Sequence, residues 1–385
     1  MADQADALLR QLAHATGSVA IGGLTGAGLL GERAALNHWR IGGDISPGAG
    51  CILFHAADDR VALNLAREDD RALLPALFEE EFDVSFDSFI ATLIERMNAT
   101  EFVARARMLG LAAAQETERA VSQVSLGALI AKGAPGPPPS KRAPRVLDFS
   151  ALWAGPLASH LMWLAGANVI KVESARRLDG MRAGDKDFYD LLNQGKASVS
   201  IDFSSHEGRA ALRRLIHEAD IVIEASRPRA LRNLGLDADA LVQEQPGLVW
   251  LTITAHGARG EEAEWVGFGD DCGVAAGVSA AMRAASGVSG FVGDAIADPL
   301  TGLNAALTGW NAWRGGEGGR YDVSLRASAQ ATLETARAEN LKRLNASLRA
   351  WANARGAPFP DVPCRPISAP VAATGEDNAR FLAPC

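Results

Sequence analysis

The sequence has few of the features that mark secreted, metal-bound or membrane proteins. Its four cysteines, Cys51, Cys272, Cys364 and Cys385, stand far apart and form no C-x-x-C pair. This spacing indicates neither a disulfide framework nor a zinc site. No run approaches the roughly 18–20 apolar residues of a membrane span, and the N-terminus lacks the basic-then-apolar layout of a signal peptide. We therefore expect a cytoplasmic protein without a membrane partner.

The charge balance and the missing motifs exclude further classes. The formal net charge is −8, whereas binding to a phosphate backbone requires a basic face, so nucleic acid is not an expected partner. The seven histidines form no H-E-x-x-H spacing, and no G-x-S-x-G is present. The sequence thus favours neither a metalloprotease nor a serine hydrolase, and we expect no metal.

The sequence does contain one literal G-x-G-x-x-G, GAGLLG at 26–31. In a dinucleotide-binding unit a buried strand runs straight into the first glycine, and further βαβ units follow. Here GGLT separates SVAI from the motif, and no regular strand–helix alternation follows. We interpret GAGLLG as a structural turn leading into the helix ERAALNHW.

A chain of 385 residues with 48% hydrophobic residues is long enough for two or three domains of about 100–200 residues each. The proline- and glycine-rich stretch at 131–145 predicts a linker. Before it, GCILFHAADDRVALNLA predicts two strands around a turn at Asp58–Asp59, and three stretches with helical spacing follow. We expect a small α+β domain over 1–130.

The region after the linker alternates between strands and helices. RVLDFS, NVIKVES, SVSIDF, IVIEAS and LVWLTIT are short, apolar and β-branched, and helical patterns separate them. This alternation predicts an α/β fold with a doubly wound, Rossmann-like parallel sheet over 146–330, followed by a C-terminal helix and closing tail over 331–385. Such sheets bind ligands at the carboxyl ends of their strands.

Basic residues gather at or near these strand ends although the whole chain is acidic. Guanidinium groups at such positions suit the phosphates of a bound nucleotide. We expect phosphate binding above all from the four arginines that directly follow strands, Arg176, Arg177, Arg227 and Arg229. The whole basic group at or near strand ends comprises Lys171, Arg176, Arg177, Arg182, Lys196, Arg227, Arg229 and Arg232.

A carboxylate at a helix start is the candidate catalytic group. Asp298-Pro299 precedes an apolar helical pattern, which predicts Asp298 as an N-cap and Pro299 as the first helical residue. A positioned, ionised carboxylate is also what nucleophilic catalysis through an acyl intermediate requires. Asp294 is the rival candidate.

The second region resembles the family III CoA-transferases, which include formyl-CoA transferase, carnitine CoA-transferase and the α-methylacyl-CoA racemases. The matching pieces run in the family's order: VLDFSALWAGPLASHLMWLAGANVIKVES, LLNQGKASVSIDF, EGRAALRRLIHEADIVIEASRPRALRNLGL, GLVWLTITAHG, GDAIADPLTGLNAALTGW and GGRYDVSL. The resemblance implies a Rossmann-like CoA-binding domain, a smaller domain, and two chains interlocked as a homodimer. The family's nucleophilic aspartate falls on Asp298.

The resemblance also implies that acyl-CoA and a carboxylic acid are substrates and that no cofactor is tightly bound. The chain departs from the family's pattern in placing its small domain first, as in a permuted chain or a remnant of a tandem copy. Ala225-Ser226 stands for the usual Asn-Phe, and Ala197 for the arginine of Lys-Arg-Ser. The positions that we assign to CoA binding are Leu152, Trp153, Ala154, Arg176, Arg177, Ile201, Phe203, Ala225, Arg227 and Arg232.

Four functions follow from these patterns. The first is an acyl-CoA:carboxylate CoA-transferase that acts through an aspartyl-acyl anhydride. The second is an acyl-CoA racemase, which Phe268 disfavours because it occupies the position of the racemases' catalytic histidine. The third is a CoA-binding paralogue without turnover, and the fourth is an NAD-dependent oxidoreductase that uses GAGLLG.

Overall fold

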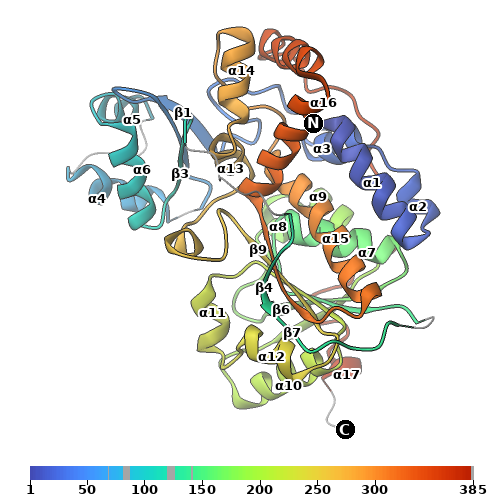
Figure 1. The fold of residues 1–385 in the computed structure, drawn as a ribbon. Helices are drawn as coiled ribbons and strands as arrows, with labels where there is room; N and C mark the ends of the chain where they lie inside the picture. The colour runs from blue at the N-terminus through green and yellow to red at the C-terminus, as the bar shows by residue number, and fades with distance from the viewer. Residues whose placement is uncertain (68, 81–86, 119–125, 140–141, 383–385) are drawn as a thin grey trace.

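The computed structural model describes residues 1–385 apart from 68, 81–86, 119–125, 140–141 and 383–385 (Figure 1). Within the described residues, the larger unit is built on a seven-stranded sheet in the order β4-β10-β9-β8-β5-β6-β7. At one edge β4 (Ala128–Lys132) runs antiparallel to β10. The parallel strands are β5 (Arg145–Asp148), β6 (Asn168–Ser174), β7 (Ala197–Ile201), β8 (Ile221–Glu224), β9 (Val249–Thr254) and β10 (Gly319–Ser324).

The strand order confirms the predicted doubly wound fold. From β5 the chain proceeds outward to β6 and β7, and it then returns to the other side of β5 for β8, β9 and β10. The direction of winding therefore reverses between β5 and β8. In open α/β sheets a crevice forms at such a switch point, outside the carboxyl ends of the strands.

Both faces of the sheet are buried, as the apolar strands predict. Val146 and Ile223 belong to the core on one face, whereas their neighbours Leu147 and Val222 belong to the core on the other. Alternate residues of a strand point to opposite faces, so a sheet covered on both sides needs continuous apolar runs. One face packs against α7 (Ala154–Leu164), α9 (Lys186–Asn193) and α15 (Ala297–Gly315), and the other against α10 (His206–His217) and α12 (Ala238–Glu244).

A smaller α+β unit precedes the large sheet in the chain. The predicted hairpin is confirmed, since β1 (Cys51–His55) pairs antiparallel with β2 (Arg60–Asn64), which pairs with β3 (Ala112–Gln115). One face of this sheet is covered by α4 (Leu74–Phe78), α5 (Asp87–Ile94) and α6 (Ala99–Met108). The other face packs against α13 (Gly269–Ala275) and Phe291.

The N-terminal helices do not belong to the small unit, contrary to the domain expected over 1–130. Leu9 and Leu12 of α1 (Ala2–Thr16) share the core of α7 and α15, and Trp310 Nε1 of α15 donates to Ala15 O at 3.2 Å. The short α2 (Val19–Gly22) and α3 (Gly26–Leu36) follow in the same layer. These helices bury one apolar face against the large unit, which the sequence alone does not reveal. The linker expected over 131–145 likewise begins inside β4.

The interpretation of GAGLLG as a turn is wrong, because its six residues form the first turns of α3. Thr25 caps this helix through a bond from the Gly28 N–H. A Cβ on Gly26 would lie 2.3 Å from Ala2 O, and one on Gly28 would lie 2.8 Å from Pro363 O. The glycines therefore allow α3 to pack closely against α1 and the C-terminal tail. They leave no space for a pyrophosphate at this helix start.

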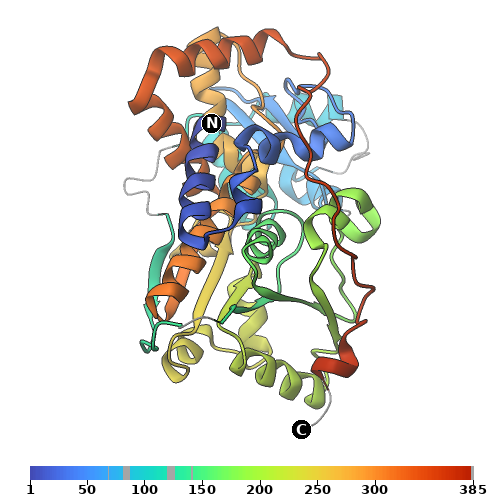
Figure 2. The ribbon, with the colours of Figure 1, turned by 90° about the vertical axis from the view of Figure 1, so that its right-hand side faces the viewer.

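The C-terminal segment runs along much of the molecule. The small α14 (Val278–Ser286) packs beside α16 (Leu325–Asn353), which has non-helical backbone at Asn340. The tail then descends past the large unit to α17 (Asn378–Phe381) near β7 (Figure 2). No described helix is long and apolar enough to cross a membrane.

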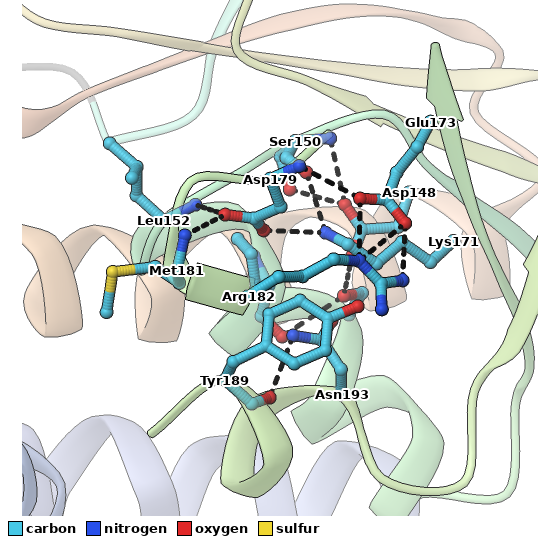
Figure 3. A network of polar contacts seen from close by, with 12 residues as sticks. Asp148, Ser150, Leu152, Lys171, Glu173, Asp179, Met181, Arg182, Tyr189 and Asn193 are labelled. Carbon is cyan, nitrogen blue, oxygen red and sulfur yellow. Dashed lines mark hydrogen bonds and ion pairs between the residues drawn. The ribbon is translucent and has the colours of Figure 1, made fainter. Parts of the chain in front are cut away.

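A network of buried charges lies beneath the carboxyl edge of the sheet (Figure 3). Lys196 Nζ lies 3.0 Å from Asp148 Oδ2, and Lys171 Nζ lies 2.9 Å from Asp179 Oδ2. All four side chains are almost completely buried. Lys171 also donates to Ser150 O at 3.0 Å, which ties β6 to the loop after β5. The network therefore fixes the loops in which the predicted ligand-binding residues lie.

Each buried charge of this network has a compensating partner. Burial alone would raise the pKa of Asp148, but the charges of Lys196 and Lys171 lower it to about 2. Burial lowers the pKa of Lys196 to about 8. An uncompensated buried charge is far more costly than a paired one. The network is consequently sensitive to the loss of a single member.

We predict that Lys196→Met lowers the free energy of unfolding by about 3–5 kcal/mol, because Asp148 stays buried without its closest cation. Urea titration followed by circular dichroism measures the change. The matched control is Lys186→Met, which removes an exposed lysine that pairs with Asp190 and should cost less than about 1 kcal/mol. Equal effects of the two substitutions would show that the buried network contributes no special stability.

Candidate functional site

Asp298 lies in the first turn of α15, near the carboxyl edge of the sheet. The expected N-cap role is wrong, because Ile296 is the N-cap residue and helical backbone begins at Ala297. The Asp298 N–H donates to Ala295 O at 2.8 Å, within a turn that precedes the helix. Its carboxylate accepts instead from the backbone N–H of Ala154, at the start of α7. The side chain is thus directed at the neighbouring helix and not at its own.

Gly269 lies on the other side of this carboxylate. A Cβ at this position would lie 2.3 Å from Asp298 Oδ2 and 2.3 Å from Ala295 O. Any larger residue would therefore displace Asp298 or the turn before it. Gly269 begins α13, so three helices, α7, α13 and α15, start around one carboxylate.

Arg33 of α3 is the cation of this cluster. Its Nε donates to Asp294 Oδ2 at 2.8 Å, and its Nη2 donates to the other oxygen of Asp294. The guanidinium lies over the rings of Trp153 and Trp39, 4.6 and 5.2 Å from their centroids. Asp294 is fully buried. The rival candidate is therefore engaged on both oxygens, whereas Asp298 is only partly buried.

Burial, together with the surrounding charges, shifts the pKa of the Asp298 carboxyl upward. Burial raises the pKa of Asp298 to about 7, with a further increase from the negative charges of Asp270 and Asp294. The Arg33 charge acts in the opposite direction. Burial also raises the pKa of Asp270 to about 6, and its Oδ1 accepts from the Ala295 N–H at 2.9 Å. Strongly shifted pKa values are a mark of functional sites.

The loop between β5 and α7 brings the start of the LWAGP stretch (152–156) to the cluster, and its first two side chains differ in their exposure to solvent. Leu152 is 39% exposed and has a φ of 68°, a left-handed conformation that is costly for a non-glycine residue. The Asp179 carboxylate accepts from the Leu152 N–H at 3.2 Å and so holds this backbone. Trp153 is only 1% exposed and packs against Arg33 and Phe188. Its ring therefore cannot offer a surface to CoA.

The predicted basic patch is smaller than the sequence indicates. Lys171 and Lys196 are buried in ion pairs, and Arg182 pairs with Glu173 and lies over the Tyr189 ring. These three cations are thus engaged within the protein. The exposed ones are Arg176, Arg177, Arg227 and Arg232, and the side chain of Arg229 lies outside the described part of the chain.

The exposed arginines lie on the two sides of the switch point. Arg176 and Arg177 follow β6, and Arg227 and Arg232 follow β8, with Arg232 in the short α11 (Pro228–Asn233). Because β6 and β8 both neighbour β5, these side chains flank the β5–α7 loop. Arg176 is 74% exposed and lies 3.6 Å from Asp202, a loose surface pair that a phosphate can displace.

The other residues predicted to contact CoA differ in how far a ligand can reach their side chains. Ala225 is exposed at the end of β8, and Phe203 is partly buried after β7. Ile201 is 3% exposed and packs in the core beneath α10 and α12. Its side chain therefore serves the fold, and only its backbone can reach a ligand.

The sequence reasoning missed Arg33, Asp270 and Gly269. Asp270 and Gly269 stand in the GFGDD stretch that was read only for Phe268, which is partly exposed at the N-cap of α13. Arg33 follows GAGLLG by two residues, but no spacing rule connects it with residues 294–298. It could be found only from the packing of α3 against α15.

The large unit is similar to a family of known proteins. The model of CoA-transferase family III matches residues 144–377, which is more than half of the chain. A succinyl-CoA–D-citramalate CoA-transferase of Chloroflexus aurantiacus is 30% identical over 209 residues, covering 50% of each chain. A succinate–glutarate CoA-transferase of Agrobacterium fabrum is 32% identical over 221 residues, covering 51% of this chain and 54% of its own.

Among solved structures, the hypothetical protein Rv3272 of Mycobacterium tuberculosis aligns with a TM-score of 0.47 and 28% identity, covering 55% of this chain and 61% of its own. The chain spans about half the length of the curated relatives that it matches. The family match lies on the large sheet, the β5–α7 loop and the segment that carries Asp298. From this match, the chain belongs to CoA-transferase family III.

Proposed function

We propose that the protein transfers CoA from an acyl-CoA thioester to a free carboxylic acid, with Asp298 as the nucleophile. The observation that carries this proposal is the Asp298 carboxylate itself, held between Ala154 and Gly269 in a chain of this family. Two relatives are named as a succinyl-CoA–D-citramalate CoA-transferase and a succinate–glutarate CoA-transferase. We extend only the reaction type, and not these substrates, to this chain.

In the proposed reaction an oxygen of ionised Asp298 attacks the thioester carbonyl carbon, and the C–S bond breaks. CoA leaves as the thiolate, and the acyl group stays on Asp298 as a mixed anhydride. The thiolate then attacks the Asp298 carbonyl carbon of the anhydride, which releases the donor acid and leaves an aspartyl-CoA thioester. The acceptor carboxylate attacks this thioester and displaces the thiolate, forming a second anhydride. The thiolate finally attacks the acceptor acyl carbon, so that the acceptor leaves as its CoA thioester and the Asp298 carboxylate is regenerated. No redox step occurs, and CoA enters and leaves as a substrate.

The geometry supports Asp298 over Asp294 as the nucleophile. Both oxygens of Asp294 accept from the Arg33 guanidinium, and the side chain has no exposed surface. Asp298 accepts one backbone hydrogen bond and keeps part of its surface accessible. A racemase would need a base to remove the proton on the α-carbon, and Phe268 carries no titratable group. The homodimer stays a prediction from the resemblance.

We predict that Asp298→Asn lowers transferase turnover at least about a thousandfold, because an amide is a far poorer nucleophile than a carboxylate. Asn keeps an oxygen that can accept from the Ala154 N–H, so folding and CoA binding should be retained. Donor acyl-CoAs are screened against carboxylic acids by mass spectrometry. The unmodified protein should form a hydroxylamine-sensitive adduct on the peptide that contains Asp298.

The matched control is Asp237→Asn, which changes a carboxylate at the start of α12 and should keep full activity. If Asp298→Asn retains activity on a verified substrate pair, the nucleophile is another group. If the unmodified protein binds CoA but turns over no pair and forms no adduct, the non-catalytic alternative holds.

A second prediction concerns pH. Since the pKa of Asp298 is raised to about 7, kcat/KM should rise as the pH increases through this value and the nucleophile ionises. Arg33→Gln removes the cation that lowers this pKa and leaves the negative charges of Asp270 and Asp294. The rise in activity should therefore move to higher pH by about one unit or more.

Arg33→Lys is the control for this effect, because it keeps the positive charge while losing the bidentate contact. Its pH profile should lie closer to that of the unmodified protein. Profiles of kcat/KM for the three proteins, with thermal unfolding measured in parallel, separate electrostatics from folding. An unchanged apparent pKa in Arg33→Gln would exclude Arg33 from the ionisation of the nucleophile.

We also propose that Arg176, Arg177, Arg227 and Arg232 hold the CoA phosphates. The double change Arg176→Ala/Arg177→Ala should weaken CoA binding about tenfold or more, since hydrogen bonds to charged groups contribute about 1.5–3 kcal/mol each. Calorimetric titration with CoA measures this loss. Arg337→Ala/Lys342→Ala, which removes two exposed cations of α16, is the charge-matched control. An equal affinity for CoA in both double variants would show that Arg176 and Arg177 do not hold the phosphates.

A further inference from the structure

Three chemically different ligand groups meet in the interior beside the candidate site. His256 follows the end of β9, and Asp271 and Cys272 lie in the first turn of α13. One potential ligand atom from each lies within 4.8 Å of the others. His256 is 3% exposed, and the other two side chains are fully buried. The sequence did not predict this cluster, because His256 lies outside the element that holds the adjacent Asp271 and Cys272 and forms no recognised spacing with them.

The His256 ring has no hydrogen-bond partner for either nitrogen among the described residues. A neutral imidazole carries one donor and one acceptor, and a buried polar group left unpaired costs about 1–3 kcal/mol. The ring packs edge-on against Trp265, with centroids 5.5 Å apart. This contact orients the ring but satisfies neither nitrogen. The cluster therefore lacks a group that could bind His256.

The other two side chains direct their potential metal-ligating atoms into the same space and contact each other there. Asp271 Oδ1 accepts from the Phe268 N–H at 2.9 Å and from Asn64 Nδ2 at 3.3 Å, which leaves Oδ2 on the side of Cys272. The Cys272 thiol can donate its proton to that oxygen, 3.8 Å from Sγ, or to Ala255 O at 3.5 Å. The hydrogen bond from the Phe268 N–H to Asp271 anchors the start of α13, so the position of Asp271 does not depend on a ligand.

A nitrogen, a sulfur and a carboxylate oxygen together form a donor set that zinc prefers. A thiolate and a carboxylate would also balance the charge of a divalent cation. The nearby Arg107 and Arg326 do not oppose such a cation strongly, because both form ion pairs with Glu118 at 2.9 and 3.0 Å. Burial raises the pKa of the Cys272 thiol and raises that of Asp271 to about 7. A bound cation would relieve this cost by stabilising both anions.

We propose that His256, Asp271 and Cys272 form a binding site for Zn²⁺. On binding, the Cys272 thiol loses its proton to solvent and its sulfur coordinates the metal, together with a ring nitrogen of His256 and Asp271 Oδ2. A water molecule or Ala255 O completes four-coordination. The metal would join the end of β9 to the start of α13, where Gly269 contacts Asp298. The site does not depend on the proposed transferase reaction, because metal binding is measured without a substrate.

The test uses the full-length protein without an affinity tag. The protein is treated with a chelator, exchanged into metal-free buffer and exposed to a slight molar excess of Zn²⁺ or Co²⁺. We expect stoichiometric zinc by elemental analysis and a higher melting temperature. With Co²⁺ we expect the intense visible absorption of a tetrahedral site and a thiolate-to-metal charge-transfer band.

Four variants locate the site. His256→Ala and Cys272→Ala should lose the zinc, the melting shift and the cobalt spectrum. Cys364→Ala removes an exposed thiol, and Cys51→Ala removes a buried thiol outside the cluster; both should retain all three signals. If the charge-transfer band survives in Cys272→Ala and disappears in Cys51→Ala, the proposed ligand set is wrong.

The unmodified protein alone decides the proposal if a cluster variant does not fold. Failure to retain zinc, with no melting shift and no cobalt spectrum, overturns the site. These readouts do not involve acyl-CoA or Asp298. Loss of the zinc site and loss of the proposed transferase function are therefore separate results.

Discussion

The hydrogen bond from the Leu152 N–H to Asp179 links the buried charges of the large sheet to the candidate site. Lys171 holds Asp179, Asp179 holds the left-handed backbone of Leu152, and two residues later Ala154 meets Asp298. A strained loop persists only where its surroundings fix it. Here the fixing groups are ions that are too deeply buried to exchange their partners for water. The position of the candidate nucleophile thus depends on residues that never contact it.

The sequence predicted the large unit well, because its signals are local. Short apolar strands, helical patterns and the order of the elements follow from neighbouring residues, and the strand order then confirms the doubly wound sheet. Predictions that depended on tertiary environment were less successful. Lys171 and Lys196 belong to the predicted phosphate-binding group, although each is buried in an ion pair, with Asp179 and Asp148 respectively. Asp298 was placed as an N-cap, but its partner lies on α7.

The N-terminal region shows why the sequence predicted only part of the candidate site. GAGLLG attracts attention as a motif, yet its glycines serve the contacts of α3 with α1 and the tail. The residue that belongs to the site is Arg33, two residues further along the helix, which reaches Asp294 across 261 positions of sequence. Pairing over such a separation leaves no periodic pattern. The small α+β unit likewise reaches the site through α13, which lies between its sheet and Asp298.

The tail that crosses the large unit has a consequence for self-association. β7 is an edge strand, and an uncovered edge offers free N–H groups to the strands of other molecules. Asp377 and Asn378 accept from the N–H groups of Ser198 and Ser200, and the Asp377 N–H donates to Ser198 O. These two residues therefore cover backbone hydrogen-bonding groups at the exposed edge of β7. Without them the core would stay packed, but β7 could pair with strands of other molecules. The protein would then aggregate before its free energy of unfolding changed much.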